Sequence, residues 1–315
     1  MAYCIGVDLG GTNIAAGIVD LDSRQIVKKA SIKTNAPRPC EAISKDIVEL
    51  CESLCSSTNI PLKDMKWIGV ATPGIVKNGV VASASNLGWK NAELVNIIKG
   101  LSGINAFATN DANAAAYAEA LWGAGKDRNS LIAITLGTGV GGGIVTNGKI
   151  WEGINGFAAE IGHVIIDVEG RACSCGKRGC LEAYCSATAL VRETKRYMKL
   201  YPDSLMWKIC DGDINRVNGV TPFKASYSGD FAASVVVDDF TKYLAIGVSN
   251  VINIFQPDVV CIGGGISAEG DKLMKPLREK LERISFGIEN SRTRVEAAKF
   301  MNDAGIIGGA LLGMQ

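Results

Sequence analysis

The single histidine of the sequence, His163, is followed closely by three cysteines that could bind a metal ion with it. Cys173, Cys175 and Cys180 form the pattern Cys-x-Cys-x4-Cys. Three thiolates and one imidazole are a complete tetrahedral ligand set for Zn²⁺, and they leave no position open for water. The pattern therefore predicts a structural zinc site. A lone histidine beside three ordinary reduced cysteines is the alternative, and the tight spacing argues against it.

Two carboxylates lie at the ends of this stretch, Glu160 before the histidine and Glu182 after the last cysteine. Because a metal ion would fix the chain between them, it would also fix the direction in which both side chains point. We therefore expect Glu160 and Glu182 to be held in place by the metal site.

Two glycine-rich turns, residues 8–13 (DLGGTN) and 136–143 (LGTGVGGG), could bind phosphate groups. Glycine permits close backbone approach and inward-pointing N–H groups. Each turn lies between two strand-like segments, whereas a dinucleotide-binding turn is followed by a helix. Glycines are also common in ordinary hairpins, but two similar turns and a third at residues 263–265 favour a polyphosphate site. The third turn could contact an adenosine.

Asp8 opens the first turn, and a carboxylate beside phosphates typically binds Mg²⁺ directly or through water. Thr12 could donate a hydrogen bond to a phosphate oxygen. The alternative for Asp8 is a turn aspartate that bonds to its own backbone.

Asp111 lies in the segment Asn110-Asp111-Ala112-Asn113, where a predicted strand meets a predicted helix. Composition alone favours a helix N-cap at this position. The helix dipole should hold an aspartate ionised there, which is also the state that a general base requires. Ligands of α/β sheets bind at the carboxyl ends of strands, where Asp111 would lie. Asn86 lies in a predicted loop and could bind hydroxyl groups or simply form a turn.

The elements that must position these residues form two similar halves. In the first we expect strands at 3–8, 14–20, 25–32, 66–76, 78–85 and 104–110, and helices at 39–56, 91–101 and 111–123. In the second we expect strands within 130–150, at 257–263 and at 294–299, and helices at 187–200, 203–210, within 230–256, at 271–285 and at 303–314. Residues 7–10 and 17–19 match residues 134–137 and 143–145. This internal repeat predicts two related α/β domains, 1–123 with about 301–315, and 124–300.

Composition narrows the class of protein. The chain has 315 residues, with 33 basic and 32 acidic side chains. This balance gives no indication of a nucleic-acid partner or an anionic membrane. We find no apolar run of the roughly 20 residues that span a bilayer, and no signal-peptide pattern at the N-terminus. Cys4, Cys51 and Cys261 lie in apolar or amphipathic segments, so we expect a cytoplasmic protein with reduced cysteines.

Together these motifs resemble the ROK family of sugar kinases and repressors, and within it the bacterial glucokinases. The resemblance covers essentially the whole chain. Its most specific part is CSCGKRGCLE at 173–182, supported by EIGH at 160–163, LGTGVGGG at 136–143 and DLGGT at 8–12. TPG at 72–74, SNLGW at 85–89 and NDANAA at 110–115 also match. Thr72 is a mild departure, since many members carry glycine there.

The resemblance implies an actin-like, ribonuclease-H-like fold of two domains, with a sugar bound between them and ATP with Mg²⁺ over the glycine turns. The implied nucleotide-binding residues are Asp8, Gly10, Gly11, Thr12, Asn13, Gly137, Thr138, Gly139, Gly263, Gly264 and Gly265. Asp111 would be the general base for the sugar 6-hydroxyl group. The implied sugar-binding residues are Asn86, Asn110, Asp111, Glu160, His163 and Glu182.

The expected reaction is the ATP-dependent phosphorylation of glucose to glucose 6-phosphate, the entry to glycolysis. The same residues would also suit N-acetylglucosamine, N-acetylmannosamine or fructose. A sugar-sensing protein without catalysis is the less favoured alternative. Repressors of the family carry an additional N-terminal helix-turn-helix domain, whereas this sequence begins at the first strand. The resemblance also implies a dimer or a tetramer.

Overall fold

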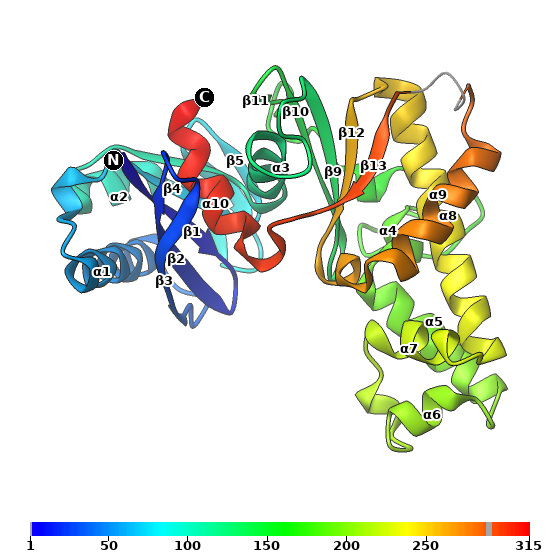
Figure 1. Ribbon diagram of the computed structural model, residues 1–315. Helices are drawn as coiled ribbons and strands as arrows, with labels where there is room; N and C mark the ends of the chain where they lie inside the picture. The colour runs from blue at the N-terminus through cyan, green and yellow to red at the C-terminus, as the bar shows by residue number, and fades with distance from the viewer. Residues whose placement is uncertain (1, 288–291) are drawn as a thin grey trace. The chain divides into compact units, whose positions relative to one another are not determined.

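The structure is a computed structural model that describes residues 2–287 and 292–315 as two compact units (Figure 1). The first unit contains Met1–Ser130, Gly143–Ala159 and Asn302–Gln315. The second contains Leu131–Gly142 and Glu160–Met301. The sequence did not signal the return of residues 143–159 to the first unit. The division at residues 123 and 301 remains a proposal.

A five-stranded sheet forms the core of the first unit, in the order β3-β2-β1-β4-β8. Its strands are β1 (Tyr3–Leu9), β2 (Asn13–Asp20), β3 (Gln25–Lys33), β4 (Ile68–Thr72) and β8 (Ala106–Asn110). The first three strands pair antiparallel, and β1, β4 and β8 run parallel. The carboxyl ends of these parallel strands therefore meet at one edge of the sheet. Leu9, Thr72 and Asn110 end them there, which brings Asp8 and Asp111 to the same edge.

Four α-helices accompany this sheet in the part of the chain that the structure describes. They are α1 (Cys40–Thr58), α2 (Leu94–Ser102), α3 (Asp111–Leu121) and α10 (Ala304–Leu311). One face of α1 lies in the core, since Ile43 and Ile47 are fully buried. A three-stranded sheet, β5 (Ile75–Lys77), β6 (Val80–Ala84) and β7 (Trp89–Ala92), follows β4. Strand β7 corrects the prediction of a helix over 91–101, because α2 begins only at Leu94.

Helix α10 packs directly on the backbone of β1 and β4, and glycines make this possible. An ideal Cβ atom on Gly6 of β1 would lie 1.7 Å from the carbonyl oxygen of Ile306. A Cβ on Gly69 of β4 would lie 1.9 Å from the carbonyl oxygen of Gly309, and one on Gly308 would lie 1.9 Å from that of Ala114 in α3. The C-terminal helix thus fits into a groove that side chains would fill.

The second five-stranded sheet has the order β11-β10-β9-β12-β13. Its strands are β9 (Ser130–Leu136), β10 (Val140–Thr146), β11 (Lys149–Ile150), β12 (Val259–Gly263) and β13 (Arg294–Ala297). As in the first sheet, β9, β12 and β13 run parallel, and β10 and β11 pair antiparallel. Strand by strand the second sheet has the topology of the first. The internal repeat read from the sequence therefore corresponds to a repeated fold.

The second unit contains six α-helices within the described residues. They are α4 (Glu182–Cys185), α5 (Ala187–Leu200), α6 (Leu205–Ile209), α7 (Val220–Tyr227), α8 (Phe231–Phe255) and α9 (Asp271–Ile284). Helix α8 is continuous, where the sequence left one or two helices open, and the Asp230 side chain caps its first turn. Helices α4 and α7 were not predicted. Among the described residues, no helix combines the length and apolar character that membrane spanning requires.

Candidate functional site

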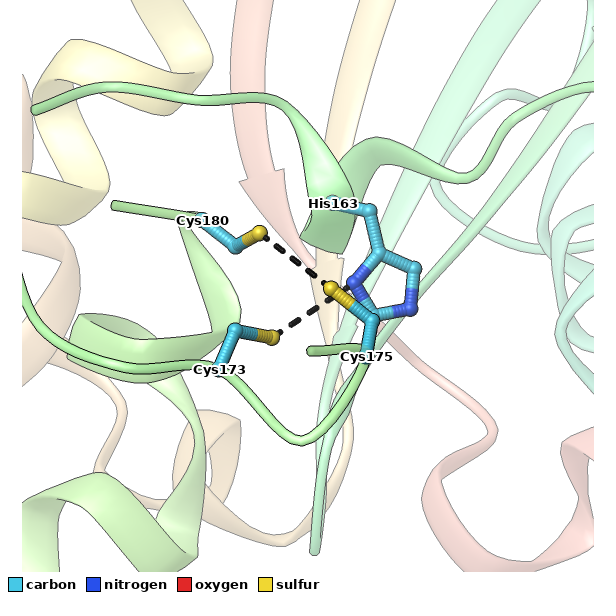
Figure 2. A group of neighbouring side chains, drawn as sticks. All are labelled: His163, Cys173, Cys175 and Cys180. Atoms are coloured by element: carbon cyan, nitrogen blue, oxygen red, sulfur yellow. Dashed lines mark hydrogen bonds between the residues drawn. The ribbon is translucent and has the colours of Figure 1, made fainter. Parts of the chain in front are cut away.

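The four predicted metal ligands lie together in the second unit (Figure 2). One potential ligand atom from each of His163, Cys173, Cys175 and Cys180 lies within 4.8 Å of all the others. The Cys173 sulfur is 3.8 Å from Nδ1 of His163, and the Cys175 and Cys180 sulfurs are 3.7 Å apart. Four ligands about 2.3 Å from Zn²⁺ would be separated by about 3.8 Å in a tetrahedron. The group therefore fits zinc in both donor type and spacing.

The knuckle that carries the cysteines, residues 171–181, depends on Gly176 and Gly179. Both have positive φ angles, 86° and 77°. A Cβ atom on Gly179 would lie 1.7 Å from the carbonyl oxygen of Asp167, and Gly179 donates its N–H to the Arg171 carbonyl oxygen at 2.8 Å. The turn can therefore close around an ion only with glycine at this position.

The environment of the thiols is consistent with metal binding. The backbone N–H of Lys177 is the main cause that lowers the pKa of the Cys175 thiol, which favours the thiolate that binds metals. Burial raises the pKa of the Cys180 thiol to about 12, so this ligand would lose its proton when a cation lies beside it. In Figure 2, Nδ1 of His163 faces the sulfurs and Nε2 points away from them, which leaves Nε2 available for another partner.

We expect Cys175→Ala to lose zinc and stability together, because metal binding and folding are coupled at such sites. Metal analysis should give about one zinc ion per wild-type chain and much less in the variant. The melting temperature should fall in parallel. Cys40→Ala is the control, since it removes a buried thiol of α1 without touching the cluster and should leave the zinc content unchanged. Full zinc occupancy with unchanged stability in Cys175→Ala would count against the metal site.

Each of the first two glycine turns is closed by one of its own backbone hydrogen bonds. Gly10 donates to the Asn13 carbonyl oxygen at 2.9 Å, and Gly137 donates to that of Gly139 at 3.0 Å. The next two N–H groups of each turn, from Gly11 and Thr12 and from Thr138 and Gly139, have no acceptor within residues 2–287 and 292–315. Unpaired backbone donors at adjacent positions are suited to bind phosphate oxygens.

The third turn, residues 263–265, lies beside the second within the same unit. Gly264 has a φ angle of 83°, and a Cβ atom there would lie 2.4 Å from the carbonyl oxygen of Leu136, where β9 ends. Strands β9 and β12 run parallel, so the turns that follow them lie at one edge of the sheet. The structure therefore brings together the second and third predicted nucleotide-binding turns.

Asn110, and not Asp111, caps helix α3. Its Oδ1 accepts hydrogen bonds from the N–H groups of Ala112 and Asn113, at 2.9 and 3.4 Å, and its Nδ2 donates to the Gly74 carbonyl oxygen at 2.8 Å. Asp111 is the first helical residue and is exposed to solvent. Asn110 thus makes the cap. Asp111 Oδ1 also accepts the Ala112 N–H, at 2.8 Å, while the residue stays exposed and accessible for chemistry.

The surrounding protein raises the pKa of Asp111 although the residue remains open to solvent. Desolvation is the largest cause, and hydrogen bonds from the Ala112 N–H and neighbouring groups offset only part of it. The direction of this shift is opposite to the one expected from the helix dipole. A carboxyl group with a raised pKa is a stronger base once it is ionised.

The Asp8 carboxyl lies at the same edge of the first sheet. Burial raises its pKa to about 6, and the nearby charge of Asp111 adds to the rise. A Cβ atom on Gly305 would lie 2.5 Å from its Cγ, so the carboxyl packs against the first turn of α10. A divalent cation would stabilise both of these mutually repelling carboxylates in their ionised form. The Mg²⁺ expected at Asp8 remains a proposal.

The raised pKa of Asp8 makes a pH-dependent contribution to stability. Because the folded state binds this proton up to about pH 6 and an unfolded aspartate releases it near pH 4, unfolding should become easier as pH rises between these values. Without added Mg²⁺, we expect Asp8→Asn to melt at a higher temperature than wild type at pH 7.5. The difference in melting temperature between Asp8→Asn and wild type should disappear toward pH 4. Thermal melts from pH 4 to 8 test this, with the exposed Asp64→Asn as control; a pH-independent difference would contradict it.

The remaining predicted residues are distributed over the two units. Asn86 is exposed between β6 and β7. A Cβ added to Gly11 would lie 3.4 Å from the Cβ atom of Asn86, so Asn86 borders the first turn. Glu160 is exposed and directly precedes the single turn Ile161–His163. Glu182 begins α4 and contacts both the knuckle and the second turn. Its partner Ser174 was not predicted, and only its position inside the Cys-x-Cys pattern hinted at it.

Comparisons with known proteins agree over nearly the whole chain. The model of the ROK family matches residues 4–315. A glucokinase of Thermotoga maritima is 37% identical over 309 residues, which cover 97% of this chain and 95% of that protein. A ROK family glucokinase from Streptomyces griseus, solved in complex with glucose and AMPPNP, has a TM-score of 0.83 at 32% identity and 99% coverage of both chains. A xylose repressor of Caldicellulosiruptor bescii is 29% identical, and the matched region covers 96% of this chain and 76% of the repressor.

Proposed function

The chain belongs to the ROK family, and on that basis we propose that it phosphorylates glucose on its 6-hydroxyl group at the expense of ATP. Its fold is the two-domain actin-like, ribonuclease-H-like fold of ROK sugar kinases. The observation that carries the proposal is the accessible Asp111 carboxylate at the strand edge that also holds Asp8 and the first glycine turn. Glucokinases among the relatives support glucose as the substrate.

In the proposed reaction, the unpaired N–H groups of the first two glycine turns hold the phosphates of ATP, and the turn at 263–265 contacts the adenosine. Asp111 accepts the proton of the sugar 6-hydroxyl group as its oxygen attacks the γ-phosphorus, and the bond to the β-phosphate oxygen breaks to release ADP. Mg²⁺ near Asp8 would neutralise the phosphate charge. Transfer of this kind depends mainly on positioning and charge neutralisation, which these residues would supply.

The other proposed contacts of the sugar come from side chains that bind hydroxyl groups. They are Asn86 and Asn110 in the first unit, and Glu160, His163 and Glu182 in the second. Nδ1 of His163 would bind zinc, so Nε2 can face a hydroxyl group. Zinc would then be structural in its coordination while it fixes a residue that binds the substrate.

The experiment that tests this function is an ADP-release assay with ATP and Mg²⁺ across a panel of sugars. We expect the highest kcat/KM for glucose. If kcat/KM for N-acetylglucosamine, N-acetylmannosamine or fructose is equal or higher, that sugar and not glucose is the substrate, and the proposed mechanism still applies. Sugar binding without ADP release would instead indicate a sugar sensor, the activity suggested by the repressors among the relatives.

We further propose that the protein acts in the cytoplasm at the entry to glycolysis, as a dimer or a tetramer. The nearly balanced charge gives no reason to expect DNA as a partner. Size-exclusion chromatography with light scattering would determine the oligomeric state, and a monomer would contradict that part of the proposal.

A further inference from the structure

The Glu182 carboxylate connects the zinc knuckle to the second glycine turn. Its Oε1 accepts a hydrogen bond from the Ser174 hydroxyl group at 2.9 Å, and the Cys173 sulfur lies 3.7 Å from the same oxygen. Its Oε2 accepts the backbone N–H of Val140 at 3.0 Å. Within the second unit, one oxygen therefore bonds to the knuckle and the other to the second glycine turn. The first segment lies next to proposed sugar-binding residues, and the second is a proposed phosphate-binding turn.

The turn has no space for a side chain at this contact. A Cβ atom on Gly139 would lie 2.4 Å from Glu182 Oε2, so the carboxylate lies directly against the turn. Two residues in the first turn of α5 also donate hydrogen bonds to the glycine turn, but both donate to carbonyl oxygens of the turn. Ala187 donates to the Gly137 oxygen and Thr188 to the Thr138 oxygen, each at 2.8 Å. Of these three hydrogen bonds to the turn, only the one to Glu182 involves an N–H group of the turn, that of Val140.

We propose that Glu182 is a positioning residue for the nucleotide, which holds the second glycine turn in its phosphate-binding conformation by tying it to the zinc knuckle. This inference rests on the proposed function, because it takes the turn to bind a phosphate. With the Val140 N–H held by Glu182 and the Gly137 N–H closing the turn, the N–H groups of Thr138 and Gly139 between them remain free for the ligand.

The role in nucleotide binding is compatible with the proposed contact of Glu182 to the sugar. A carboxylate offers about four acceptor positions. The Val140 N–H, the Ser174 hydroxyl group and the Cys173 thiol use three of them here. A hydrogen bond from a backbone N–H to a charged carboxylate is also among the stronger kinds in proteins. The knuckle would thus influence both substrates, the sugar through His163 and Glu182 and the nucleotide through Glu182 alone.

Ser174→Ala tests the inference without changing a metal ligand or a proposed substrate contact. Loss of one hydrogen bond to the carboxylate should raise the dissociation constant of ATP, measured without sugar, by about three- to tenfold. The dissociation constant of glucose, measured without ATP, should stay within about twofold. Ser174→Thr keeps the hydroxyl group and should restore wild-type ATP binding. Ser228→Ala, which removes an exposed hydroxyl group that donates to the Lys224 carbonyl oxygen of α7, is the matched control.

Amide hydrogen exchange reports on the tie itself, independently of activity. Peptides covering residues 136–143 should exchange faster in Ser174→Ala and in wild type after zinc is removed by a chelator, while α1 of the first unit keeps its protection. Unchanged exchange and unchanged ATP affinity in a zinc-replete Ser174→Ala protein would overturn the proposal. If wild type binds no ATP, the proposed function fails, and the nucleotide role of Glu182 fails with it. Exchange would then show only whether the tie exists.

Discussion

Asp111→Asn is expected to lower kcat by about 10²- to 10⁴-fold, the range typical of a lost general base, and to leave sugar affinity nearly unchanged. The amide keeps the size of the carboxylate and can still bond to a sugar hydroxyl group, but it cannot accept the proton. The Asn110 cap does not depend on Asp111, so helix α3 should remain intact. Single-turnover kinetics and calorimetric titration with glucose would measure the two effects separately.

The pH dependence of the wild-type enzyme gives a second measure of this role. Since desolvation raises the pKa of Asp111, the acidic limb of the kcat/KM profile should lie above the value near 3.9 of an ordinary aspartate. Asp64→Asn, at an exposed position, should reproduce the wild-type profile. Near-normal turnover in Asp111→Asn would remove Asp111 from the role of base, whereas loss of sugar binding together with turnover would assign it to binding instead.

The candidate metal ligands and the turns could be predicted because they are encoded locally in the sequence. The four candidate zinc ligands lie within one short stretch, and glycines between alternating apolar segments indicate strand, turn and strand. The fold followed from the repeat of these turns. Strand β7 was assigned in part to a helix because residues 89–92 are too few to show an alternating pattern, and their pairing with β6 is a tertiary contact.

Other features depend on contacts between distant parts of the chain. The raised pKa of Asp111 reflects how much protein surrounds it, whereas the sequence showed only its place at a helix start. Glu182 was expected to bind sugar, but its bond to Val140 joins residues 42 positions apart. The C-terminal helix and strands β1 and β4 could each be predicted from the sequence, but the backbone contact between them could not.

A large loss of stability is expected from Gly69→Ala, because α10 and β4 meet backbone to backbone. The added Cβ would lie 1.9 Å from the Gly309 carbonyl oxygen, and no change of rotamer can move a carbonyl group of a helix. Either α10 shifts away from the sheet or β4 distorts. We expect a loss of about 3 kcal/mol or more in the free energy of unfolding, at the upper end of the cost of overpacking.

Gly100→Ala separates this steric effect from the general consequences of replacing glycine. Gly100 lies in α2, where an added Cβ would have no described atom within 4 Å beyond its chain neighbours and the nearby backbone of its own helix. Alanine there should stabilise the protein by about 0.5–1 kcal/mol, because it lowers the entropy of the unfolded chain and favours the helix. Denaturant unfolding would measure both effects. If the backbone contact between α10 and β4 determines stability, the free energy of unfolding should fall in Gly69→Ala and rise in Gly100→Ala. A loss below about 1 kcal/mol for Gly69→Ala would mean that α10 can move off the strands, and with it the Gly305 turn that lies against Asp8.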